Sequence, residues 1–320
     1  MIKISLSKRF SSAEAIGYTP NYLLVKSVDS LTVFSEADFL PYHKVVSLSY
    51  GKRVLTSPNG KFAFVLSTLF SNSLIVYYVP SLRIADTYCY KGAGIFDIKD
   101  ACFSLDSQYL FILADVVTDK GSQTLLIRKK LLSDEKPFSM VLDTAFDYLS
   151  FVKEVNCLAL FAKSGKIGFF QGNEVIQEVS LNPFHKAYFI EKGHLLVTDT
   201  TLGFNLLSHN GKVIQQCDFL VPVPLVPKTI TEDESESFKI KESYYDLLAS
   251  NEANLIFYVT RILPNEVYSL YIFSSEDFSL LKRIKFKAKI YSLDYRNPYL
   301  FIKTSIGVYV FRIKNLKKDG

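Results

Sequence analysis

The residue types that most often carry catalysis or metal binding are sparse in this chain, and their spacing indicates no reaction. No GxSxG nucleophile motif occurs, and the glycines of KGAGIFD (91–97) lack the GK[ST] ending of a phosphate loop. The histidines do not have the HxH or HExxH spacing of metal sites, and each falls at an expected strand start or turn: His43, His185, His194 and His209. We therefore expect no catalytic residue, no metal and no cofactor.

Basic residues are unevenly distributed along the 320-residue chain. The net charge is +5, but residues 281–320 contain 11 Lys and Arg against two acidic residues. In RIKFKAKI (283–290) the basic and apolar residues alternate, so Phe286 points away from the lysines. A nucleic-acid site would combine basic residues with exposed aromatic rings, whereas lysines on an outer strand discourage pairing between sheet edges. The second interpretation is favoured, and no nucleic-acid partner is expected.

Cysteine usage and the N-terminal residues bear on the cellular compartment. The four cysteines are far apart and form no CxxC pair: Cys89, Cys102, Cys157 and Cys217. In a chain this long and apolar, we expect free, buried thiols rather than disulfides. The first ten residues lack the apolar core of an export signal, and no run is long enough to span a membrane. A cytoplasmic protein without a membrane span is expected.

The elements that must position any site follow from a repeated pattern: a turn-forming residue, a large apolar residue and a short hydrophobic strand. Copies begin at positions 21, 61, 108, 156, 194, 254 and 298, at intervals of 40, 47, 48, 38, 60 and 44 residues. Such a period is typical of repeat architectures. Further strand-like runs accompany the copies, for example SLIVYYV (73–79) and RIADTYCY (83–90). We predict an all-β fold in which residues 1–320 form one domain, a seven-bladed β-propeller of four-stranded antiparallel blades.

Two copies resemble the blades of a known group of proteins. SPNGKFAFV (57–65) and FSLDSQYLFIL (103–113) are similar to the Ser-Pro-Asp-Gly-Lys-Tyr-Leu turn of WD40-like and YVTN-type propellers, and residues 73–88 resemble their third and fourth strands. The chain contains no Trp, so the Trp-Asp dipeptide of WD40 repeats is missing. The resemblance implies a propeller fold but no particular activity, because propellers include hydrolases, oxidoreductases and scaffolds.

The opening segment MIKISLSKRF (1–10) has the alternation of a half-buried strand. Ile2, Ile4 and Leu6 alternate with polar residues. The last copy supplies only three strands, so we expect residues 1–10 to form the outermost strand of the last blade and to close the ring. Closure of this kind removes an open edge between the first and last blades.

Two classes of function stay open. The first is a non-catalytic protein-binding platform, a scaffold or adaptor whose top-face loops bind another protein. The second is a hydrolase of the lactonase type with a site at the mouth of the central channel. The absence of an acid–base set on the expected inner strands favours the platform.

The top face is expected to consist of the loops between second and third strands together with the blade-to-blade connections. These loops are charged and vary in length, as is typical of recognition surfaces on rigid scaffolds. They include an inserted loop (220–243) with an acidic run, located between the fifth and sixth blades. The candidate binding residues in the loops between second and third strands are Asp29, Asp115, Asp119, Lys120, Lys163, Asp199, Arg261 and Lys303. Those in the blade-to-blade connections are Lys99, Lys186 and, in the insertion, Glu232, Asp233, Glu234 and Glu236.

Overall fold

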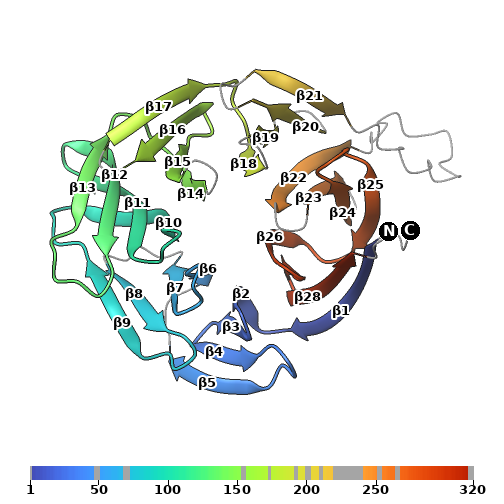
Figure 1. Cartoon of the computed structure of the whole chain (residues 1–320), viewed down its shortest axis with the longest axis horizontal. Helices are drawn as coiled ribbons and strands as arrows, with labels where there is room; N and C mark the ends of the chain where they lie inside the picture. The colour runs from blue at the N-terminus through green and yellow to red at the C-terminus, as the bar shows by residue number, and fades with distance from the viewer. Residues whose placement is uncertain are drawn as a thin grey trace, which may run out of the picture. The chain divides into compact units, whose positions relative to one another are not determined.

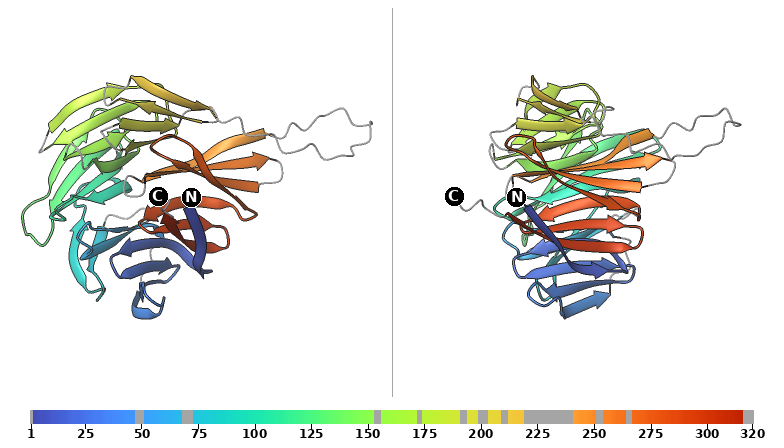
Figure 2. Two further views of the ribbon diagram at one scale, coloured as in Figure 1. Left: turned by 45° about the vertical axis from the view of Figure 1, so that its right-hand side comes forward. Right: turned by 90° about the vertical axis from the view of Figure 1, so that its right-hand side faces the viewer.

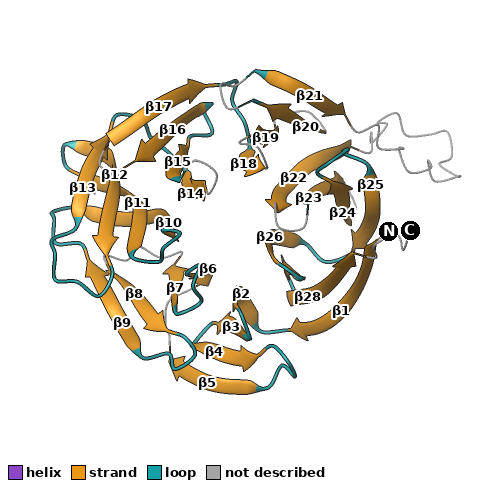
Figure 3. Ribbon diagram, viewed as in Figure 1, coloured by secondary structure: helices purple, strands orange, loops and turns teal. Residues whose placement is uncertain are grey.

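Only strands and their connections occur in the part of the chain that the computed structural model describes (Figure 3). They form seven four-stranded sheets in which consecutive strands pair antiparallel. The predicted fold class, an all-β seven-bladed propeller with four-stranded blades, is confirmed. Within the same residues, no helix has the length and hydropathy needed to cross a membrane. The described residues are 2–46, 51–67, 73–152, 156–171, 174–190, 194–198, 203–208, 212–218, 241–250, 254–263 and 267–315.

Two compact units are distinguished by their internal contacts. Unit 1 comprises Met1–Ile4, Phe184–Ser305 and Ile313–Gly320, and unit 2 comprises Ser5–Pro183 and Ile306–Arg312. The assignment of residues 1–320 to a single domain stays a prediction.

Unit 2 contains four complete blades that follow one another along the chain (Figure 1). Blade 1 consists of β2 (Ala13–Thr19), β3 (Tyr22–Ser27), β4 (Ser30–Ser35) and β5 (Pro41–Val46). Blade 2 consists of β6 (Gly51–Thr56), β7 (Phe62–Ser67), β8 (Ser73–Tyr78) and β9 (Ile84–Cys89). Blade 3 consists of β10 (Ile95–Phe103), β11 (Tyr109–Thr118), β12 (Gly121–Lys130) and β13 (Phe138–Leu142). Blade 4 consists of β14 (Tyr148–Val152), β15 (Cys157–Phe161), β16 (Lys166–Gln171) and β17 (Glu174–Ser180).

Unit 1 contains two complete blades. Blade 5 consists of β18 (Lys186–Ile190), β19 (His194–Thr198), β20 (Gly203–Leu207) and β21 (Val213–Asp218). Blade 6 consists of β22 (Lys241–Ser250), β23 (Leu255–Leu263), β24 (Val267–Ser274) and β25 (Leu280–Phe286). The edge position of β25 confirms the interpretation of its lysine-rich sequence as an outer strand. The chain between β21 and β22, which includes most of the predicted insertion, lies outside the described residues.

Blade 7 combines the two ends of the chain. Its strand order is β1-β28-β27-β26. The edge strand β1 (Ile2–Phe10) neighbours β28 (Gly307–Asn315), which is followed by β27 (Tyr299–Thr304) and β26 (Ile290–Arg296). Figure 2 shows β1, in dark blue, alongside the red strands of this blade. Arg9 Nη2 donates a hydrogen bond to the Ile306 carbonyl at 2.8 Å, and its guanidinium lies 5.3 Å from the Tyr309 ring. The predicted role of the opening segment as the fourth strand of the last blade is confirmed.

The alternation predicted for β1 is wrong in one respect. Leu6, expected on the buried face, is 55% exposed, whereas Ile4 and Ser7 are half-buried. An edge strand has a neighbour on one side only, and its faces are incompletely covered. Hydrophobic alternation in the sequence therefore does not impose alternating burial there.

The turn that carries the family resemblance has the same hydrogen bonds in blades 2 and 3. The Ser57 hydroxyl donates to Asn59 Oδ1 at 2.8 Å and accepts from the Phe62 backbone N–H at 2.9 Å. In blade 3 the Ser104 hydroxyl plays the same part, with Asp106 in the place of Asn59. A short side chain that bonds to its own turn stabilises the reversal locally. The two matching segments thus form equivalent turns.

In the described part of the chain, four bulky residues in turns between third and fourth strands have a positive φ: Phe39, Leu82, Leu132 and Phe278. Leu82 (φ 54°) is 3% exposed and belongs to the core of blades 1 and 2, so burial offsets its strained backbone. Leu132 (φ 55°) is 55% exposed and has no such compensation. The left-handed region is unfavourable for branched residues and better tolerated by Asn.

Leu132→Asn is accordingly expected to raise the free energy of unfolding by about 0.5–1 kcal/mol, since it relieves strain without removing core packing. Urea unfolding midpoints provide the measurement. Leu82→Asn is the matched control and should be destabilising, because it places an amide in the apolar core. Equal shifts in the two variants would contradict this account.

The hydrophobic cores of unit 2 lie between neighbouring blades. Phe64 of blade 2 packs against Phe103 of blade 3, with ring centroids 5.2 Å apart. The same interface contains an ion pair between Lys129 Nζ and Asp86 Oδ2 at 3.1 Å, with side chains 8% and 13% exposed. Asp86 also accepts the backbone N–H of Leu132 at 2.9 Å. The backbone N–H of Thr87 donates to the other carboxylate oxygen, Oδ1, at 2.7 Å, so both oxygens of this largely buried acid have donors, as a charge in such a position requires.

Three of the predicted thiols, Cys89, Cys102 and Cys157, are confirmed as unpaired, but their predicted burial is wrong for Cys89, which lies exposed on the edge strand β9; Cys102 is half-buried and Cys157 is buried. Desolvation raises the pKa of Cys157 to about 11 and moves that of Cys102 upward as well. Both groups therefore remain neutral thiols near pH 7. The side chain of Cys217 lies outside the described residues.

Candidate functional site: a projecting hairpin on blade 3

The first three strands of blade 3 are long compared with those of the next blade. β10, β11 and β12 contain 9, 10 and 10 residues, whereas β14 and β15 contain 5 each. The backbone N–H of Leu149 in β14 donates to Asp100 Oδ2 at 3.2 Å, which sets the start of β14 level with Asp100. Residues 95–99 and 114–124, termed the blade 3 hairpin, therefore project beyond that level, at the end where the second and third strands connect.

A β-bulge positions Lys99 on this hairpin. Ile98 is paired with Ala114 and Asp100 with Leu113, so Lys99 is the extra residue on β10. A bulge interrupts the regular alternation of side chains and redirects the extra residue. Here Lys99 Nζ lies 3.2 Å from Asp115 Oδ2 on β11.

The Lys99–Asp115 pair extends to the third strand. The Thr124 hydroxyl on β12 donates to Asp115 Oδ1 at 2.7 Å, and Thr124 itself is 6% exposed. Asp97 lies opposite Asp115 in the register, so the lysine offsets repulsion between two facing carboxylates. These contacts hold the side chains of three strands in one arrangement. The cluster supplies a fixed charge pattern rather than an acid–base pair.

Above this cluster the hairpin exposes an apolar pair. Ile95 and Val117 are directly opposite each other on β10 and β11, and their exposed fractions are 55% and 45%. Side chains opposite each other in an antiparallel pair share one face of the sheet. The adjacent turn presents Asp119 and Lys120, both exposed. An apolar centre with a charged border is typical of a protein-binding surface.

Four of the predicted binding residues thus lie on one hairpin: Lys99, Asp115, Asp119 and Lys120. Lys99 was expected in a blade-to-blade connection, but it lies within β10. Its contact with Asp115 could not be read from the sequence, because a bulge is not visible in a hydrophobic pattern.

The other predicted residues are placed separately. In unit 2, Lys163 is exposed in the turn after β15, and its backbone N–H donates to Asp147 Oδ2 at 2.8 Å. In unit 1, Lys186 is the first residue of β18 rather than part of a connection, and its Nζ lies 6.0 Å from the Tyr188 ring. Arg261 and Lys303 lie on β23 and β27. The following predicted residues lie outside the described residues: Asp199, Glu232, Asp233, Glu234 and Glu236.

Asp29 stands beside a buried lysine that the sequence analysis did not single out. Lys26 has no exposed side-chain surface; its Nζ donates to the carbonyls of Ser27 and Val28 and lies 3.8 Å from Glu14 Oε2. Desolvation lowers the pKa of Lys26, and the charges of Glu14 and Asp29 oppose this effect. The ammonium therefore supports the turn between β3 and β4. In the sequence, Lys26 follows the hydrophobic run NYLLV (21–25), and nothing there indicates that its side chain is buried.

A buried carboxylate links the first strands of three blades in unit 2. Asp100 Oδ1 lies 2.9 Å from Arg53 Nη1 of β6 and accepts the Ala101 N–H at 3.0 Å, while Oδ2 accepts the N–H of Leu149. The Asp100 side chain is 5% exposed and that of Arg53 is 50% exposed. Both carboxylate oxygens are therefore engaged by structural donors. We assign Asp100 to holding the blades together.

In the described ranges, no group of three or more histidine, cysteine, aspartate or glutamate side chains lies close enough together to hold a metal ion. His43 is exposed beside Tyr42, with ring centroids 4.8 Å apart. His194 begins β19, and His209 lies outside the described residues.

No protein-family model matches the chain, and no curated protein matches its sequence.

Proposed function

We propose that this propeller is a non-catalytic protein-binding platform, and that the blade 3 hairpin is its main contact surface in unit 2. The observation that carries the proposal is the exposed Ile95–Val117 pair beside the fixed Lys99–Asp115 pair. A rigid apolar centre loses little conformational entropy on binding, and charges at its border favour encounter with a complementary partner.

The partner is another protein, and the platform operates in the cytoplasm as a scaffold or adaptor. We also propose that the chain is a divergent member of the WD40-like and YVTN-type propellers, with the matching turns at Ser57 and Ser104 as support. The acidic insertion and the other charged top-face residues are proposed as additional parts of the surface.

The lactonase-like alternative finds no specific support in the described residues. Asp100 is a buried carboxylate on a first strand, but both of its oxygens accept structural hydrogen bonds. A general base must come within hydrogen-bond reach of a substrate proton, and the Asp100 side chain, which is 5% exposed, is closed to a substrate. We therefore favour a protein-binding platform over a lactonase-like hydrolase.

The test begins with capture of partners from the source cell's extract, followed by binding measurements with the purified partner. Val117→Lys and Ile95→Lys are each expected to weaken binding at least tenfold, or about 1.4 kcal/mol, with unchanged thermal unfolding. The lysine would place an unpaired charge at the apolar centre of the interface.

Ile84→Lys is the matched control. Ile84 is 62% exposed on the edge strand β9, away from the blade 3 hairpin, and its substitution should leave affinity unchanged. Equal affinity for all three variants would remove the hairpin from the binding surface. Turnover of a lactone or ester by a protein that captures no partner would favour the hydrolase instead.

A further inference from the structure

A pocket opens between blades 3 and 4, at the opposite end of these blades from the blade 3 hairpin. Its volume is about 370 Å³. It is bordered by the turns between first and second strands, which include Ser104–Asp106 in blade 3 and Asn156 in blade 4. Recognition was expected at the top face, so this pocket was not predicted from the sequence.

The walls of the pocket are largely aromatic. Phe111 of β11 and Phe151 of β14 pack against each other at a tilt, with ring centroids 6.2 Å apart, and Phe170 of β16 lies beneath the surface at 2% exposure. Cys157 adds a neutral thiol, since burial raises its pKa. These groups provide flat apolar surfaces and no activated nucleophile. They suit a planar ring better than a flexible polar chain.

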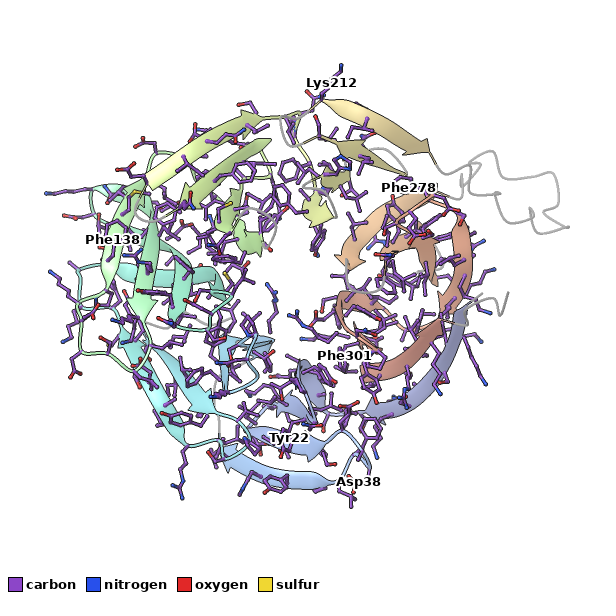
Figure 4. All side chains as sticks on the ribbon, in the orientation of Figure 1. Tyr22, Asp38, Phe138, Lys212, Phe278 and Phe301 are labelled. Carbon is purple, nitrogen blue, oxygen red and sulfur yellow. The ribbon has the colours of Figure 1, made fainter. Side chains whose placement is uncertain are left out.

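Among the described residues that line this aromatic site, Arg128 supplies the cationic side chain. On β12 it lies opposite Phe111 on one side and Phe138 on the other. Its guanidinium carbon is 5.3 Å from the Tyr109 ring and 5.6 Å from the Phe138 ring. Figure 4 labels Phe138 on the edge strand of this blade. Aromatic packing on several sides holds the guanidinium in a defined orientation.

Stacking on aromatic rings does not use the hydrogen-bond donors of an arginine. The rings engage the faces of the guanidinium, whereas its five N–H donors lie in its plane. A carboxylate can accept two such donors side by side, in addition to any protein group that the arginine also binds. The acid that lines the pocket, Asp106, accepts bonds within its own turn from Ser104 Oγ and the Gln108 N–H.

We propose that this pocket binds a small aromatic carboxylate, with its ring against the wall that Phe151 forms with Phe111 and its carboxylate on Arg128. The volume is at the lower end of the range for ligand pockets, which fits one ring and a short acidic arm. The amides of Asn156 and Gln171 at the pocket supply further donors to the carboxylate. This site is independent of the proposed protein-binding surface.

Phenylacetate is the probe, and its binding is followed by NMR titration of the full-length protein. A Kd on the order of 1 mM is expected for a ligand of this size. Phenethylamine has the same ring with the opposite charge and should bind at least tenfold more weakly. Because this comparison uses the wild-type protein, it does not depend on the folding of any variant.

Arg128→Gln should weaken phenylacetate binding at least tenfold, and Phe151→Ala should weaken both probes. Arg283→Gln is the matched control: Arg283 stacks on Tyr271 at 4.9 Å in blade 6 and does not line this pocket. It should leave the phenylacetate Kd unchanged, as should Val117→Lys on the blade 3 hairpin. Equal affinity for the two probes, unchanged affinity in Arg128→Gln, or no saturable binding up to about 10 mM would each overturn the proposal.

Discussion

Removal of residues 2–10 is expected to lower the free energy of unfolding by several kcal/mol. The deletion takes away the edge strand of blade 7 and with it the contacts of Arg9 with Ile306 and Tyr309. It also removes Phe10, whose ring packs edge-on against Phe34 of blade 1 at 5.0 Å. At about 25 cal/mol per Å² of apolar surface, exposure of roughly 150 Å² alone costs about 4 kcal/mol. Thermal and urea unfolding provide the measurement.

A synthetic peptide of residues 2–10 should restore part of the lost stability when added in excess, whereas a scrambled peptide should not. Gly307→Ala tests the same junction without a deletion. Gly307 has φ 118°, and an added Cβ would overlap the Phe10 carbonyl and approach the Ser11 Cα to 2.7 Å. A deletion variant that unfolds at the wild-type midpoint would show that β1 does not hold blade 7 together.

Asp100→Ala is the second large effect and should cost about 3 kcal/mol. The substitution leaves the backbone N–H groups of Ala101 and Leu149 without their acceptor in a buried position, and each unsatisfied buried group costs about 1–3 kcal/mol. It also removes the partner of Arg53. The loss is best measured as a shift in the urea midpoint at constant slope.

Arg53→Gln separates the two contributions of Asp100. Its side chain is half exposed, so the loss of this ion pair should cost under about 1 kcal/mol. Asp100→Asn should fall between the two, because one amide oxygen can still accept a backbone donor. If Arg53→Gln were as damaging as Asp100→Ala, the ion pair rather than backbone satisfaction would dominate.

The blade 3 hairpin and the pocket between blades 3 and 4 occupy opposite ends of the same pair of blades. Asp100 lies between them, since its contact with Leu149 sets the relative level of β10 and β14. A ligand in the pocket would therefore contact blade 3, which carries the hairpin, and its neighbour blade 4.

Much of the architecture could be predicted because its determinants are local. The turns between first and second strands need a left-handed residue or a short polar side chain, and both are visible in the sequence: Asn21, Gly60, Ser107, Asn156 and Asn254 all have a positive φ. A hydrophobic strand follows each of these turns within two residues. Repetition of this unit determined the number of blades, and the three-stranded last copy determined the place of β1.

The side-chain arrangement of the sites was decided by tertiary structure. Lys99 and Asp115 were both expected at the top face, but a bulge in β10 determined that they meet. Arg128 joins a pocket with Phe151 and Phe170 only because two blades pack side by side. Leu6 is exposed because an edge strand is covered on few sides. A turn depends on the conformational preferences of a few neighbouring residues, whereas these contacts depend on how distant segments pack, which no local pattern encodes.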